Sequence, residues 1–137
     1  MNELTEMTEL AARVLREHPD APRVVNVSVG YASTRDGWLA DLQLPATRTT
    51  QQAVAAVAGW ALALGTVVSA IDHSRHSSYV EISAYATVDG RAVRVWDHLH
   101  GREIADLISA TGVDVYDTRT EFEPAVLLSA FAAEAVA

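Results

Sequence analysis

The sequence predicts one α+β domain over residues 1–137, with a mainly antiparallel sheet of about five strands and helices packed mostly on one face. Two observations point to this class. Segments in which apolar and polar residues alternate, as in strands with one buried face, are joined by short turns that favour antiparallel pairing. Other segments carry an apolar stripe with helical spacing. The expected order of elements is α-β-β-α-β-β-β-α-α.

The first half of the chain gives the first helices and strands. Residues 5–18 carry a helical stripe that ends at Pro19, and Thr49-x-x-Gln52 is a capping box that opens a second helix. That helix is apolar around most of its circumference, so it should lie across the sheet with another helix or a second subunit on its back. The expected elements are helix 5–18, strands 23–31 and 38–44, helix 50–64 and strand 66–73.

The stretch from Ser78 to Gly101 is a predicted β-hairpin around which the other elements are arranged. Apolar residues occupy every second position from Val80 to Val88, and Asp89-Gly90 is typical of a two-residue type I′ turn. The return strand is 91–97, and the two-residue turn fixes its register. Expected neighbours on one face are Ile82 with Asp97, Ala84 with Val95 and Ala86 with Val93; on the other they are Tyr85 with Arg94, Ser83 with Trp96 and Glu81 with His98.

Two helices should follow the hairpin. Residues 102–111 have helical spacing and end at Gly112, and 113–116 could add a short edge strand. Thr120-x-x-Glu123 is a second capping box, which predicts a last helix from about residue 121 to 135.

Composition excludes several classes of protein. The chain has no cysteine, so disulfides, thiolate metal sites and cysteine nucleophiles are excluded. No apolar run approaches the roughly 20 residues of a membrane span, and the N-terminus is acidic where a signal peptide would be basic, so we expect a cytoplasmic protein with no membrane contact. No lysine is present, which removes P-loop and Schiff-base chemistry. Abundant arginine and alanine without lysine is typical of a GC-rich genome.

Charge argues against nucleic acid as the main partner. The net charge is −8, and the ten basic residues, all arginine, are spread along the chain instead of forming the concentrated patch that phosphate neutralisation needs. A local patch of Arg75, Arg91 and Arg94 keeps a nucleic-acid-binding accessory as one rival interpretation.

The candidate chemical site lies at the end of the hairpin, where a strand is expected to end and a helix to begin. Imidazoles and carboxylates that converge there could bind zinc or iron, or act as general acid and base, but their spacing matches no specific motif. The alternative is structural: Glu81 and His98 form a cross-strand pair, and Asp97 or His100 caps the helix, with capping the favoured role for Asp97. The candidate metal residues are His98, His100, Glu81 and His73, with His76 nearby.

The outer face of the hairpin carries a candidate interaction surface formed by Tyr79, Tyr85, Arg94 and Trp96. Aromatic rings mixed with arginine are typical of the centres of protein interfaces. The alternative is that the terminal helices cover this face.

We therefore expect a small non-enzymatic protein that acts through protein–protein contact and self-associates as a homodimer, with no cofactor. The rival from another class is a metal- or small-molecule-binding enzyme that uses the cluster at the end of the hairpin.

Overall fold

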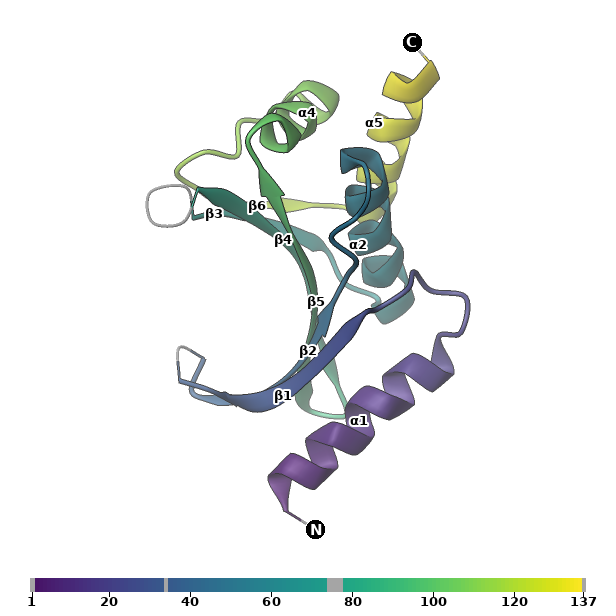
Figure 1. Ribbon diagram of the computed structural model, residues 1–137, viewed down its shortest axis with the longest axis vertical. Helices are drawn as coiled ribbons and strands as arrows, with labels where there is room; N and C mark the ends of the chain where they lie inside the picture. Colours follow the sequence, from purple (N-terminus) through teal and green to yellow (C-terminus); the bar gives the residue numbers. More distant parts are fainter. Residues whose placement is uncertain (1, 34, 74–77, 137) are drawn as a thin grey trace.

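The computed structural model of the chain describes residues 2–33, 35–73 and 78–136. Within these residues it contains four helices and one six-stranded sheet, which confirms the α+β class (Figure 1). The elements are α1 Glu3–Glu17, β1 Asn26–Ala32, β2 Gly37–Gln43, α2 Thr50–Leu64, β3 Val68–Asp72, β4 Tyr79–Val88, β5 Arg91–His100, α4 Arg102–Thr111, β6 Arg119–Phe122 and α5 Pro124–Val136.

The strands lie in the order β1-β2-β5-β4-β3-β6. All neighbouring pairs are antiparallel except β2 and β5, which run parallel, so the sheet is mainly antiparallel as predicted, with one parallel pair and six strands instead of about five. The hairpins β1–β2 and β4–β5 are each closed by a short turn and then joined along β2 and β5. That contact links residues about 50 positions apart, for which the sequence carries no local signal.

The sheet is strongly curved, with the helices on its convex side (Figure 1). The core lies between that side and α1 and α2, and its largest buried side chain is Trp60, whose indole nitrogen donates to the Pro22 carbonyl at 2.7 Å. Helix α5 packs on α2 and supplies the second cover that the apolar α2 was expected to need. The capping box predicted at Thr49 is present, and Gly65 ends α2 in the left-handed conformation.

The central hairpin has the predicted register throughout, from Val88 opposite Arg91 to Glu81 opposite His98. Asp89 and Gly90 both have positive φ, 51° and 76°, as a type I′ turn requires. The return strand, however, extends to His100 instead of ending at Asp97, so the histidines expected on a loop lie on β5.

The end of the chain differs from the prediction. Residues 113–116 form no strand, and the sixth strand is Arg119–Phe122, paired with β3. The pattern Thr120-x-x-Glu123 therefore does not open the last helix, which begins at Pro124. The pairing of residues 119–122 with β3, which sets Phe122 opposite Val68, is incompatible with a helix that starts at residue 121. Among the described residues, no helix is long and apolar enough to cross a membrane.

Candidate functional site

The predicted interaction residues lie together on the concave side of the sheet, opposite the helices. We call Tyr79, Tyr85, Arg94 and Trp96 the aromatic face. The alternation of β4 and β5 places these side chains on the side away from the core, where Val80, Ile82, Val93 and Val95 point. In Figure 1 the helices of the described residues lie on the other side of the sheet, so the alternative that the terminal helices cover the aromatic face is wrong.

Arg94 is the charged centre of the aromatic face. Its guanidinium donates from Nε to Asp41 Oδ1 at 2.8 Å and from Nη1 to Glu81 Oε1 at 2.9 Å, and Nη2 donates to the second oxygen of Asp41. Burial acts to lower the pKa of Arg94, but the hydrogen bonds that it donates to Asp41 and the charge of Glu81 outweigh this effect and raise the pKa above its ordinary value. Arg94 therefore stays charged and is held in one orientation by two carboxylates.

Aromatic rings surround this guanidinium. The Arg94 Cζ lies 5.4 Å from the Trp96 ring centre and 5.8 Å from that of Tyr85, as the predicted register allows. The Cζ of Arg35, from the β1–β2 turn, lies over the Tyr85 ring, 4.2 Å from the ring centre. Two guanidinium groups therefore lie against the rings of Tyr85 and Trp96 on this face.

His98 extends the aromatic face in a row of rings. Its imidazole stacks on Tyr79 with centroids 3.9 Å apart, and lies 4.6 Å from the Trp96 ring. Burial lowers the pKa of His98, and the opposing charge of Glu81 does not offset this, so the imidazole is neutral at pH 7.

The predicted metal residues lie near one another at this end of the hairpin, but other groups stand between them. The Tyr79 ring lies 5.0 Å from His73 and 3.9 Å from His98, and the centroids of His98 and His100 are 6.2 Å apart. Glu81 lies opposite His98 but pairs with Arg94. Within the described residues no group of three or more histidine, aspartate or glutamate side chains could hold a metal ion. His76 lies outside those residues.

Asp97 has a different role from the one predicted. The cap of α4 is Gly101, which offers no side-chain hydrogen bond, so neither Asp97 nor His100 caps this helix through its side chain. Asp97 lies inside β5 on the core side, where Arg48 Nε donates to its Oδ2 at 3.0 Å. Arg48 also binds Glu103 and the His98 carbonyl, so one guanidinium ties the start of α2 to β5 and α4.

Sequence reasoning missed Asp41 and Arg48 as partners. Asp41 reaches Arg94 because β2 pairs with β5 in a register that sets the two residues side by side. The alternation of β2 did place Asp41 on the outer face, which is the one signal available, but its neighbour depends on a long-range pairing. Of the rival arginine patch, Arg75 lies outside the described residues, Arg91 pairs with Glu6 at 2.5 Å, and Arg94 pairs with Asp41.

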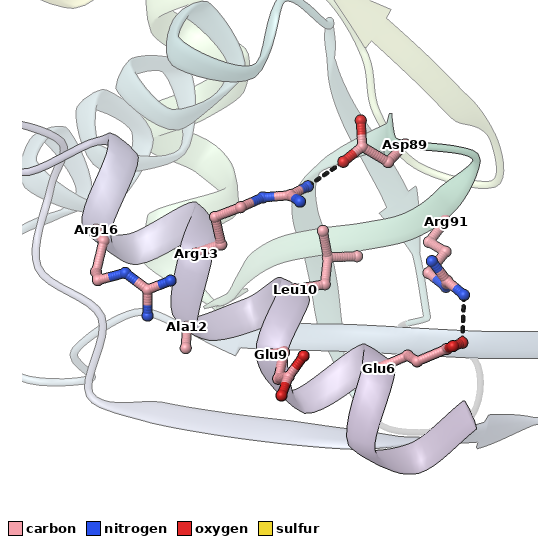
Figure 2. Close-up of a pocket in the computed structure, with 8 residues that line it drawn as sticks. All are labelled: Glu6, Glu9, Leu10, Ala12, Arg13, Arg16, Asp89 and Arg91. Atoms are coloured by element: carbon pink, nitrogen blue, oxygen red, sulfur yellow. Dashed lines mark hydrogen bonds and ion pairs between the residues drawn. The ribbon is translucent and has the colours of Figure 1, made fainter. Parts of the chain in front are cut away.

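The ion pairs of Arg91 belong to a groove between α1 and the β4–β5 turn (Figure 2). Figure 2 shows Arg13 of α1 reaching Asp89, and Arg91 reaching Glu6. Three carboxylates and three arginines line this groove, so the two signs of charge are balanced there. The two ion pairs therefore hold α1 against the hairpin. The groove carries no excess of positive charge that would attract an anion.

Comparisons of the chain with protein-family models, with curated proteins and with solved structures give no match. The class defined by the fold and the site is a small α+β domain with an open, aromatic sheet face.

Proposed function

We propose that this protein is a non-enzymatic cytoplasmic protein that acts through protein–protein contact at the aromatic face, and that it also self-associates. The supporting observation is that rings and an arginine, on the one side of the sheet without helices, are held in place by contacts inside the domain. Tryptophan, tyrosine and arginine are the residues that most often dominate binding energy in protein interfaces.

The fixed positions of the side chains in the aromatic face favour binding of a partner. Asp41 and Glu81 fix the guanidinium of Arg94, and the Tyr79–His98 stack fixes a ring. A partner that docks on such a surface loses less of its binding free energy to side-chain ordering than it would on a mobile one.

The charge of the aromatic face favours a polypeptide over a nucleic acid. The single positive charge of Arg94 is matched by two carboxylates, so the centre of the face offers no excess charge to phosphates. Its concave curvature suits a convex or extended segment of a partner (Figure 1).

Ser83 provides a polar group beneath the rings. Its hydroxyl is fully buried opposite Trp96 and has no hydrogen-bond partner among the described residues. Buried hydroxyls are normally hydrogen-bonded, so Ser83 is an exception beneath the aromatic face.

The proposal can be tested with a library of displayed peptides selected on the wild-type protein. The selected peptides should bind with a Kd that rises at least about 30-fold in Trp96→Ala, because a central tryptophan contributes roughly 2 kcal/mol or more at such interfaces. Fluorescence anisotropy of a labelled peptide measures this change. Val126→Ala, at a 60% exposed position on α5, is the matched control and should leave the Kd unchanged.

Ser83→Ala is a second control in the same assay. Removing an unpaired hydroxyl should not lower the free energy of unfolding, and because the hydroxyl is buried beneath the rings, its removal should leave the peptide Kd unchanged. The proposal fails if no peptide is selected, or if selected peptides bind folded Trp96→Ala as tightly as the wild type.

A further inference from the structure

The two edges of the sheet differ in how they are protected. β6 is a four-residue strand that carries Arg119 and Glu121, and shortness and charge are common means by which proteins block pairing at an edge. β1, at the other edge, has seven residues, Asn-Val-Ser-Val-Gly-Tyr-Ala, with neither charge nor proline. It pairs with β2 at every position from Asn26 to Ala32, so no bulge interrupts it either.

β1 also gathers exposed apolar side chains. Val27 is 42% and Tyr31 56% exposed, and Val25, just before the strand, is 48% exposed. Val27, Val29 and Tyr31 share one side of the strand, since their neighbours on β2 are Leu42, Ala40 and Trp38. The Tyr31 hydroxyl donates to Asp36, which fixes the direction of the ring. An open strand edge and exposed apolar side chains therefore coincide.

We propose that β1 is the surface through which two copies of this chain associate, by antiparallel pairing about a two-fold axis at Val29. This proposal rests on the self-association included in the proposed function and assigns a site to it. In this register all seven residues of β1 lie opposite residues of the second copy's β1. Val27 of each copy lies opposite the second copy's Tyr31, Val29 lies opposite itself, and the two six-stranded sheets become continuous.

The strand is complementary to itself in this register. An aromatic side chain opposite a β-branched one is a favourable cross-strand pair, and it occurs twice because of the symmetry. On the concave side, Ser28 meets the second copy's Gly30 and Asn26 meets its Ala32, so small side chains join the two concave surfaces. No charged residue lies on the strand, so no like charges within β1 oppose each other in spite of the net charge of −8.

Light scattering coupled to size exclusion tests the interface. Wild type should have a mass near twice 14.7 kDa. V27K/Y31K and V27E/Y31E each place like charges opposite each other and should both halve the mass, whereas an equimolar mixture should recover the doubled mass because each pair becomes Lys with Glu. L62K, at a 53% exposed position on α2, is the control and should keep the doubled mass.

Cross-linking tests the register. The chain has no cysteine, so in V29C any disulfide must join two copies; residues facing each other on a two-fold axis lie about 4.5–5.5 Å apart between Cα atoms, within disulfide range. V29C should therefore form a disulfide-linked dimer under mild oxidation. V27C should not, because four residues, about 13 Å, separate the two copies of position 27 along the strands.

The possible outcomes distinguish this inference from the proposed function. A doubled mass that survives in both charged variants overturns the β1 interface but leaves self-association standing. A wild-type monomer at high concentration overturns both this inference and the self-association, and leaves peptide binding at the aromatic face to its own test. Pairing of β1 with a strand of another protein, and not with itself, also overturns the inference.

Discussion

Arg48 shows how one residue can join three elements. Its guanidinium binds Asp97 on β5, Glu103 on α4 and the His98 carbonyl. Burial acts to lower the pKa of Arg48, but its hydrogen bonds with Asp97 and Glu103 raise the pKa overall, so the charge persists. Asp97 is buried on the core side of the sheet and depends on this charge.

Replacing Arg48 should therefore destabilise the fold strongly. Arg48→Met removes the opposite charge beside the buried Asp97, which keeps only its hydrogen bond from the His98 backbone N–H, and should lower the free energy of unfolding by about 3–5 kcal/mol, measured by urea denaturation. Arg48→Met combined with Asp97→Leu should recover much of this loss, because an apolar pair replaces a buried ion pair. Equal stability of the single and the double variant would contradict this role for Asp97.

The pKa of His98 predicts how stability depends on pH. Because burial lowers this pKa in the folded state, the unfolded chain takes up the proton first when the pH falls through about 6.5. The stability contributed by neutral His98 is thus present above pH 6.5 and is lost as the pH falls towards the lower, folded pKa.

The measurement compares unfolding free energies of wild type and His98→Gln between pH 7.5 and 5.5. The wild type should lose more stability over this range than the variant does. Parallel pH profiles of the two proteins would contradict the lowered pKa.

At the level of single residues, the sequence could predict which side chains share a face of the sheet but not which distant residues they contact. Tyr79, Tyr85, Arg94 and Trp96 share a face because alternation and a two-residue turn are local properties. The partners Asp41 and Arg48 could not be predicted, because each lies about 50 residues from the group it binds.

At the level of elements, the β4–β5 turn depends on the backbone of Gly90. Its φ is +76°, and a Cβ there would meet nothing within 4 Å, so a substitution is opposed by conformation alone. Gly90→Ala should lower the free energy of unfolding by about 1–2 kcal/mol, measured by thermal and urea denaturation.

Gly37→Ala is the matched control for this prediction, because Gly37 lies on β2 and not on the β1 edge. A Cβ at Gly37 would make only an ordinary contact, 3.9 Å from the Arg35 carbonyl oxygen, and its φ is not in the left-handed region. This variant should be as stable as the wild type or slightly more so. Equal losses at the two glycines would show that the turn conformation is not the cause.

Element boundaries were predictable where local chemistry decides them. The capping box at Thr49 and the left-handed Gly65 mark α2 correctly. The similar pattern at Thr120 was misleading, because pairing of residues 119–122 with β3 buries Phe122 and overrides the local preference. The parallel contact of β2 with β5 had no local signal at all.

At the level of the whole molecule, net charge opposes self-association, whereas the chemistry of the proposed β1 contact favours it. Each copy carries −8, so two copies repel each other, whereas the proposed β1 contact is uncharged. Raising the salt concentration from about 10 mM to 150 mM shortens the Debye length from about 30 Å to 8 Å and should strengthen self-association, measured by sedimentation.

Nucleic-acid binding would show the opposite dependence on salt, because it weakens as counterions compete. Self-association that weakens between these salt concentrations would contradict a contact made through an uncharged strand.

The unequal edges of the sheet also determine how far assembly can go. Once β1 of one copy is joined to β1 of another, the outermost strand at each end is β6, which is short and charged. Neither end then offers a template for a third chain. A pair formed in this way is closed to further growth, so the same strand that would otherwise promote fibrils produces a particle of finite size.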